Sequence, residues 1–265
     1  MLSYYSIRIW KEKVTLFYMI ISDLSRFFLS LCVLVICGTL HGQSAIDAEQ
    51  PFDSQSAGTV PWGSTQIEAG GWLQWETPEG EEVETFSYAV PVSIIRYGFR
   101  ERLEVRVAAR FSESLGEAEE ARGGIKWNIV PDADRFRVAW VSELEADLNR
   151  LTSSTRVPSR HRMCADWTDG DRWSVRANWG LRWGADSTEM VVAGAVARQV
   201  GWQGWTVFVE PVWRTVGGGR VHAGALLDID EEAQVNVGFE RDVDTGDFRF
   251  TFGYCRRIFP PSTTP

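Results

Sequence analysis

The sequence predicts an all-β protein, a closed antiparallel transmembrane β-barrel of about twelve strands with an apolar outside and a polar inside. Three observations support this fold class. Residues 102–111 alternate charged and apolar side chains, and similar alternation recurs along the chain without a sustained helical period. Short and longer connections separate the alternating segments. Together these features are the sequence signature of a membrane-spanning barrel.

The segment 102–111 shows the pattern most clearly. Leu103, Val105 and Val107 alternate with Glu104 and Arg106, so a strand here has one apolar and one ionic face. A soluble sandwich could also carry such strands. The chain offers no helix to cover the apolar faces, and twelve strands make a barrel too wide for apolar side chains to fill. In a membrane, lipid covers the apolar face of the strands, and closure of the barrel pairs every backbone group.

Bulk composition agrees with one large β domain. The chain has 265 residues, of which 44% are hydrophobic and 24% charged, so it is neither disordered nor a helical membrane protein. It contains 13 tryptophans. Their amphipathic rings favour a membrane–water interface, although ordinary core tryptophans are the alternative.

The N-terminus predicts an export signal covering residues 1–43. Basic residues precede a short apolar run over 27–40, and small or polar residues follow. The run is shorter than a membrane-spanning helix needs, although a retained anchor is the alternative. Met19 is a candidate for the true start, since it leaves a signal of ordinary length.

The rest of the chain divides into a flexible periplasmic lead over 44–63, the barrel over 64–259 and a tail over 260–265. The full chain has 27 basic and 36 acidic residues, of which 4 and 2 fall within 1–43. The exported part therefore carries a net charge near −11, which argues against a nucleic-acid partner.

The alternation defines twelve expected strands, and the patterns at 158–168 and 189–199 are the least regular. Pro91 lies inside the second strand, where its missing N–H predicts a bulge or local break. The expected strands are 64–76, 84–97, 100–111, 121–130, 135–147, 158–168, 171–183, 189–199, 204–213, 219–229, 233–241 and 247–259.

The connections test this assignment. Every second one should be a tight periplasmic turn, at 98–99, 131–134, 168–170, 201–203 and 230–232. The others should be longer outer loops, and those at 77–83, 112–120 and 148–157 are clearly longer. With an even number of strands, both ends of the barrel domain lie on the periplasmic side.

If the apolar face meets lipid, the polar face lines the lumen. Its charge is mixed and slightly basic, which biases a water-filled channel toward anions or polar solutes. Alternatively, opposite charges pair across the lumen and plug it. The residues expected to line a solute path are Arg102, Glu104, Arg106, Arg110, Lys126, Arg172, Arg176, Arg182, Glu210, Arg220, His222 and Arg249.

Catalytic motifs are absent from the sequence of the expected mature chain. His161 and His222 are its only histidines, and neither has a serine two residues later, as a barrel lipase would. There is no nucleophile elbow, phosphate-binding loop or metal-ligand cluster. Cys164 and Cys255 match no metal motif, and the strand order places them too far apart for a disulfide. We therefore expect no enzyme, cofactor or metal.

Two blocks resemble a family of bacterial outer-membrane transporters named for the MetA pathway of phenol degradation. Residues 56–70 resemble the family's opening pattern T-V-P-x-G-x-x-Q-hydrophobic-E-x-G, and residues 95–106 resemble its strand–turn–strand block. Residues 123–127 are similar to a third block. The family's acidic-Arg-Pro-Asp lead and a Pro-Thr-Gly block are missing. The resemblance implies an outer-membrane location more directly than a shared substrate.

The sequence thus predicts a Gram-negative outer-membrane channel or passive transporter for small molecules, with membrane lipid as its surroundings. A non-conducting barrel with a structural or interaction role is the second hypothesis. An outer-membrane hydrolase is the third.

Overall fold

The computed structural model describes residues 48–49, 54–76, 85–112, 118–133, 135–147, 157–169, 172–184, 187–200 and 204–260. The expected signal at 1–43 and the tail beyond Pro260 lie outside these residues. Among the described residues, no helix is long and apolar enough to cross a membrane.

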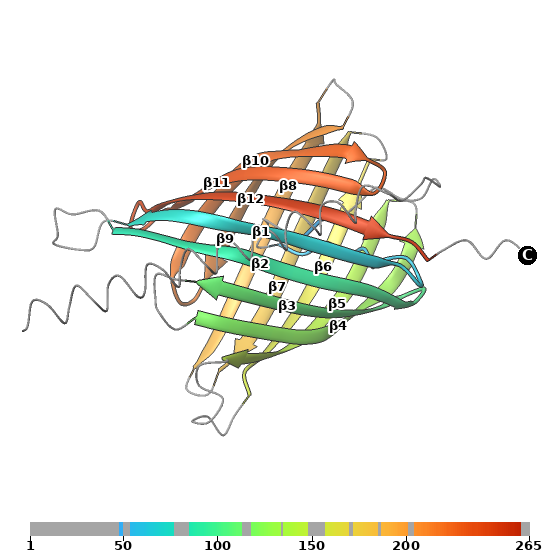
Figure 1. Ribbon diagram of the computed structural model, residues 1–265, viewed down its shortest axis with the longest axis horizontal. Helices are drawn as coiled ribbons and strands as arrows, with labels where there is room; N and C mark the ends of the chain where they lie inside the picture. Colours follow the sequence, from blue (N-terminus) through green and yellow to red (C-terminus); the bar gives the residue numbers. More distant parts are fainter. Residues whose placement is uncertain are drawn as a thin grey trace, which may run out of the picture. The chain divides into compact units, whose positions relative to one another are not determined.

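Twelve antiparallel strands form one closed barrel, in which each strand pairs with its sequence neighbours and β1 pairs with β12 (Figure 1). This confirms the predicted fold class. The strands are β1 (Thr65–Glu76), β2 (Thr85–Arg100), β3 (Leu103–Ser112), β4 (Ala118–Ala133), β5 (Phe136–Asp147), β6 (Ser159–Thr168), β7 (Trp173–Trp183), β8 (Thr188–Gln199), β9 (Trp205–Arg214), β10 (Gly218–Asp230), β11 (Ala233–Asp242) and β12 (Phe248–Ile258).

The observed strands follow the predicted ones closely, including the two with the least regular patterns, which are β6 and β8. The largest extension is in β4, which is three residues longer at each end than the predicted 121–130. A register shift in β2 between Ala89 and Val92, on both of its neighbours, matches the irregularity predicted at Pro91.

The first predicted tight turn is wrong by three residues. Strand β2 continues through Gly98 to Arg100, so the turn is at Glu101 and Arg102. Gly98 has a different role: the chain before β1 crosses it closely, and a Cβ there would overlap the carbonyl oxygens of Val60 and Pro61. A glycine in a strand marks such a close backbone approach as readily as it marks a turn.

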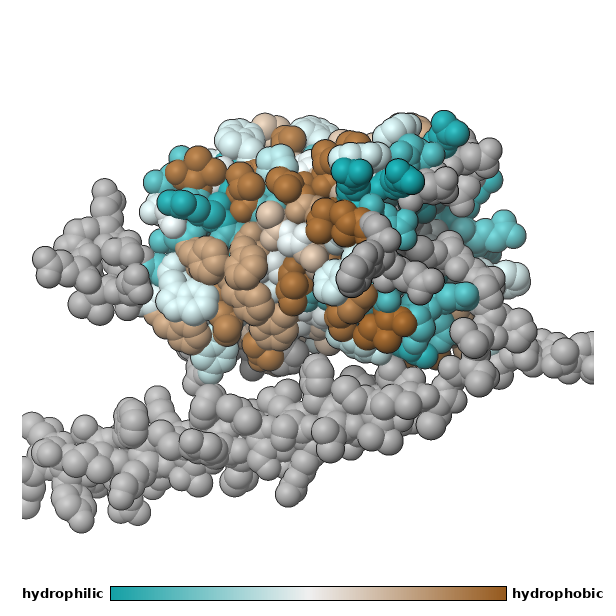
Figure 2. All heavy atoms as spheres, turned by 90° about the horizontal axis from the view of Figure 1, so that it is seen from above, coloured by the Kyte–Doolittle hydropathy of each residue, from teal (hydrophilic) through white to brown (hydrophobic). Residues whose placement is uncertain are grey.

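Side chains alternate between an apolar exterior and a polar interior. In β9, Val207, Val209 and Pro211 are exposed, whereas Phe208 and Glu210 between them are buried. Hydrophobic residues accordingly cover most of the middle of the face in Figure 2, with hydrophilic residues toward its ends. The barrel therefore has the inverted distribution that the sequence predicted.

Most exposed aromatic side chains gather toward the two ends of the barrel, whereas exposed Trp179 lies in the middle part of β7. We call the end with the β2–β3 turn the turn end, and the opposite end the loop end. Exposed valines such as Val107, Val209 and Val237 lie between them. The aromatic residues near the turn end are Trp62, Tyr97, Phe99, Trp127, Phe136, Trp167, Trp173 and Trp205; those near the loop end are Trp75, Phe86, Phe111, Trp183, Trp213 and Phe248.

Candidate solute path in the barrel lumen

The lumen contains part of the protein's own chain. We call residues 48–49 and 54–60 the inner segment. They belong to the expected periplasmic lead at 44–63, yet Glu49, Ser54 and Ser56 are almost completely buried. This corrects the expectation of a free lead for these residues, because side chains on the barrel wall satisfy the polar groups of the segment's backbone.

Strands from several sides of the barrel hold the inner segment. The backbone N–H of Ser54 donates to Glu210 Oε1 on β9 at 2.6 Å. On β7, Asn178 accepts from the Gln55 N–H at 2.7 Å and donates to its carbonyl at 2.9 Å. The N–H of Ala57 donates to Asp166 Oδ2 on β6 at 2.8 Å.

The segment's last contact lies on the other side of the lumen. The N–H of Val60 donates to Glu104 Oε2 on β3 at 3.0 Å. With the contacts to β9, β7 and β6, this bond shows that the segment crosses the lumen. Ala57 also packs with Ala139, Val141 and Cys164 in a small apolar cluster on the wall.

Glu49 is the centre of a buried ionic network. Its carboxylate pairs with Arg106 and lies 2.6 Å from Lys126 Nζ and 3.6 Å from Arg96. Arg96 Nε in turn donates to Glu104 at 2.8 Å. All five side chains are at most 2% exposed. Charges this deeply buried persist only when they are paired.

The network also determines the protonation of Glu49. Burial disfavours its charged form, but the positive charges of Arg106, Lys126 and Arg96 outweigh burial and hold the pKa of the Glu49 carboxyl well below its ordinary value. Glu49 is therefore an anion at neutral pH, and it fastens the inner segment to β2, β3 and β4.

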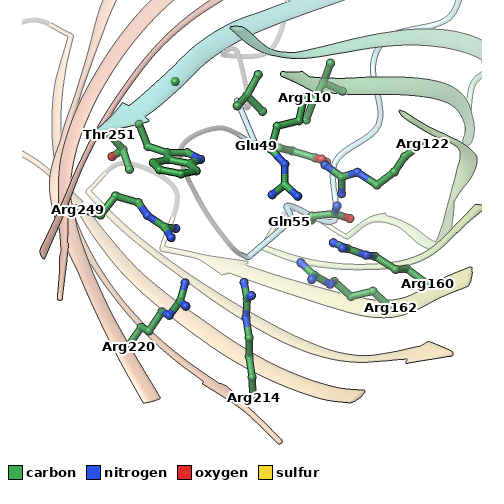
Figure 3. Close-up of a pocket in the computed structure, with 14 residues that line it drawn as sticks. Glu49, Gln55, Arg110, Arg122, Arg160, Arg162, Arg214, Arg220, Arg249 and Thr251 are labelled. Atoms are coloured by element: carbon green, nitrogen blue, oxygen red, sulfur yellow. The ribbon is translucent and has the colours of Figure 1, made fainter. Parts of the chain in front are cut away.

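On the loop-end side of this network the lumen contains a cavity of about 340 Å³. Glu49, Gln55 and Trp72 form part of its lining, and guanidinium groups from six strands point into it (Figure 3). The lining arginines are Arg110, Arg122, Arg160, Arg162, Arg214, Arg220 and Arg249.

The predicted solute-path residues fall into several groups. Glu104, Arg106 and Lys126 belong to the buried network. Arg110, Arg220 and Arg249 line the cavity. The remaining inward residues lie elsewhere on the wall: Arg182 donates to Glu145 at 2.7 Å, Arg176 lies opposite Asp166 in the β6–β7 register, and buried His222 lies 3.2 Å from Glu210 and 3.1 Å from Thr251.

Two predicted residues do not line the lumen. Arg102 lies in the β2–β3 turn and is exposed, because β3 begins only at Leu103. Arg172 is also exposed and precedes β7. Its backbone N–H donates to Asp169 Oδ1 in the turn after β6. Both arginines are at positions that would point inward if their strands extended to them. They lie beyond the strand ends, where the chain is already turning.

Sequence reasoning missed four arginines of the cavity and the whole inner segment. The four arginines occupy inward-pointing positions of the alternation in their strands; they are Arg122, Arg160, Arg162 and Arg214. Arg214 lies one residue beyond the end of the predicted strand at 204–213. The alternation itself would have found the other three. The small polar residues of the inner segment carry no comparable pattern.

Three further candidate groups, His161 and the two cysteines, lie outside the cavity. Ser142 Oγ lies 3.2 Å from His161 Nδ1 on the outward side of β5 and β6, and the imidazole lies between Trp140 and Trp183. Within the described ranges, no carboxylate contacts this histidine, and no cluster of three or more His, Cys, Asp or Glu could hold a metal. Cys164 and Cys255 are buried free thiols on opposite strands of the barrel.

No protein-family model matches the chain, and no curated protein is similar to it in sequence. Its fold is similar to that of solved outer-membrane barrels. The KdgM porin is 10% identical with a TM-score of 0.56, over 72% of this chain and 98% of the porin.

Two further structures share the fold. The COG4313 outer membrane channel from Pseudomonas putida F1 is 13% identical with a TM-score of 0.54, over 79% of this chain and 99% of the channel. The NanC porin is 8% identical with a TM-score of 0.55, over 72% of this chain and all of the porin. At these identities, the likeness establishes the fold alone, which is a closed antiparallel barrel, here of twelve strands.

Proposed function

We propose that the protein is an outer-membrane β-barrel that lets small solutes cross, with a preference for anions. The observation that carries the proposal is the combination of an apolar exterior with a charged lumen that holds a water-accessible cavity. An apolar belt between two aromatic girdles is the surface that lipid selects. A lumen lined by arginines favours negatively charged solutes.

The location follows from the same surface. Closed barrels satisfy every backbone group within lipid, and outer-membrane barrels have short periplasmic turns and longer outer loops. We place the turn end in the periplasm and the loop end outside the cell. Export through the signal at 1–43 accounts for how the chain reaches this membrane.

The inner segment makes the channel a gated one. It crosses the lumen between β9 and β3 and separates the cavity from the turn end. Solutes pass when the segment is displaced or rearranged. The buried pairs of Glu49 make displacement costly, since any charge left in the lumen without its partner is strongly unfavourable.

The family resemblance is part of the proposal. Its two blocks contain Gln66, Glu68, Arg96, Glu104 and Arg106, which meet in the wall beneath the inner segment. A shared motif that builds this polar cluster would preserve the docking site of the segment. We therefore propose that the chain descends from the MetA-pathway transporters. The property that they have in common is the docking site of the inner segment and not a substrate.

The first experiment measures ion conductance through the purified chain in planar lipid bilayers. Ala57→Cys adds a thiol to the cluster that holds Cys164, so oxidation can link the inner segment to β6. We expect low conductance in the oxidised form, higher conductance after reduction, and a preference for chloride over potassium. Serine at position 57 is the matched control, which has no thiol to link.

A deletion of residues 44–60 provides the second arm. It removes the segment and leaves the strands intact, and we expect a larger and less fluctuating conductance. If neither the reduced chain nor the deletion variant conducts, the channel proposal is overturned. The non-conducting structural barrel then takes its place, and the segment's buried contacts serve stability alone.

A further inference from the structure

We propose that the arginine-lined cavity binds a compact organic polyanion, meaning a small molecule with two or more carboxylate or phosphate groups. The inference rests on the proposed function, because such a ligand reaches the cavity only through a loop end that is open to the outside. It goes further by naming the chemical class of the solute and the residues that hold it.

The cavity has an excess of positive charge. Among the described residues, seven arginines and a single carboxylate, that of Glu49, line it. Carboxylates behind the lining are shared between arginines. Glu120 lies 2.6 Å from Arg110, 3.4 Å from Arg122 and 3.6 Å from Arg160. Arg122 also lies 3.8 Å from Glu143, and Arg160 also pairs with Glu145, which Arg182 shares. Three carboxylates therefore serve four guanidinium groups, so this wall retains donors and an excess of positive charge for an anion from solution.

On the other side of the cavity, Glu240 lies 3.2 Å from Arg220 and 3.1 Å from Arg249, and Asp242 lies 3.4 Å from Arg220. These two arginines therefore have two carboxylate partners. Both arginines are about one-fifth exposed, and Arg110 is more than two-fifths exposed. Guanidinium groups that remain in contact with water can exchange it for carboxylate or phosphate oxygens without a change in the fold.

The positions of the arginines require more than one anionic group. Arg110 on β3 faces Arg214 on β9, and these two strands are six places apart in the ring of twelve. Arg160 on β6 and Arg249 on β12 are opposite in the same way, as Figure 3 shows. A monovalent anion reaches one side of this ring. A ligand with anionic groups at both ends reaches two sides at once.

The inner segment limits the length of the ligand. Glu49 and Gln55 line the cavity toward the turn end, so an extended chain cannot run on through the lumen. The volume of about 340 Å³ lies near the lower limit of ligand pockets, roughly 300 Å³. Trp72 adds a flat apolar face beneath the Arg249 guanidinium, which lies 4.7 Å from the ring centre, and a cyclic ligand body can pack beside it.

Isothermal titration calorimetry on the full chain in an uncharged detergent tests the proposal. The probes are citrate for polycarboxylates, inorganic pyrophosphate for phosphates, acetate as a monoanion and sucrose as a neutral solute. We expect citrate, pyrophosphate or both to bind about tenfold or more tightly than acetate, with binding that weakens as salt is added. Equal affinity for citrate, pyrophosphate and acetate, or no binding of any, overturns the proposal.

Two substitutions locate the binding. Arg110→Gln and Arg214→Gln remove charge from opposite sides of the cavity, and each should weaken polyanion binding about tenfold, because each deletes charged hydrogen bonds. Arg102→Gln in the exposed β2–β3 turn is the matched control and should bind as the unaltered chain does. Circular dichroism verifies the β-sheet content of each variant, and Arg162→Gln replaces any lumen variant that does not fold. Unchanged binding in the folded lumen variants contradicts the site.

The two proposals fail separately. Calorimetry measures equilibrium binding without a bilayer, so binding without conductance overturns the channel and leaves the site. Conductance without selective binding of citrate or pyrophosphate leaves the channel and overturns the site.

Discussion

The lumen has two charged regions that differ in how their arginines are used. Around Glu49, the side chains of Arg96, Arg106 and Lys126 are at most 2% exposed and their carboxylate partners are equally buried. At the loop end, Arg110, Arg122 and Arg160 share Glu120 and remain partly exposed to water. The same residue types thus form a locked structure in one region and an open, charged surface in the other.

Burial explains the difference. An unpaired charge in the middle of the lumen would cost several kcal/mol, so every group there needs a partner. Water at the loop end screens the arginines, so their pairs contribute little to stability and remain available to a ligand. Stability and function are therefore expected to separate between the two regions.

The largest effect should come from Glu104→Gln. This carboxylate accepts from Arg96 Nε and from the Val60 N–H, and its loss leaves a buried arginine without its main partner. We expect the free energy of unfolding to fall by about 3 kcal/mol or more, measured by chemical denaturation in detergent. Glu120→Gln at the loop end is the control and should cost about 1 kcal/mol or less. Equal losses would show that the two regions do not differ.

Gly98→Ala should have the next largest effect. The added Cβ would overlap the carbonyl oxygens of Val60 and Pro61, so the inner segment must shift where it leaves the lumen. We expect a loss of about 2 kcal/mol together with raised bilayer conductance. Gly123→Ala is the control, because its Cβ would meet no atom within 4 Å. If Gly98→Ala changes neither the free energy of unfolding nor the conductance, the inner segment does not control the conductance.

Acidification should release the inner segment only at low pH. The pKa of docked Glu49 is well below its ordinary value of about 4.3. Its contribution to docking is therefore complete above pH 4.3 and is lost as pH falls through the docked pKa. Conductance should stay constant from pH 8 to pH 5 and rise below about pH 4. The Glu49→Gln variant should conduct more at neutral pH, and its conductance should rise less on acidification because this carboxyl is missing. A rise in the conductance of the unaltered chain between pH 8 and pH 5 would contradict the role of Glu49.

The smallest effect should follow from Arg102→Gln. This arginine is exposed in a turn, so its substitution should change the free energy of unfolding by less than about 0.5 kcal/mol and leave ion selectivity unaltered. Arg110→Gln in the cavity should be nearly as mild for stability but should lower the preference for chloride in reversal-potential measurements. If both variants shift selectivity equally, the cavity does not determine it.

The barrel could be predicted because its cause is local. Alternation within a single segment such as 173–183 determines a strand and its two faces without knowledge of any partner. The errors lie where alternation stops being informative. Gly98 resembled a turn residue, and Arg102 and Arg172 lie just past strand ends.

The inner segment could not be predicted, since its cause is distant. Ser54, Gln55 and Ser56 have the composition of a flexible linker, and their partners Glu210, Asn178 and Asp166 are more than a hundred residues away. Hydrogen bonds between such positions leave no periodic trace in the sequence. The resemblance of residues 56–70 to a family motif marked the region without indicating where it docks.

The inner segment is joined directly to β1, and this connection determines how well a free peptide could compete with it for its binding site. The segment is a ligand tied to its own receptor by a few residues, with the Gly63 N–H bonded to the Gly98 carbonyl at 2.8 Å. A short tether gives an effective concentration on the order of millimolar. A free peptide of the same sequence would have to exceed that concentration to replace it, and dilution of the protein cannot undock it. In the channel that we propose, opening therefore requires an event at the barrel itself: a pull on the chain, a change in charge at Glu49, or an anion that rearranges the arginines above it.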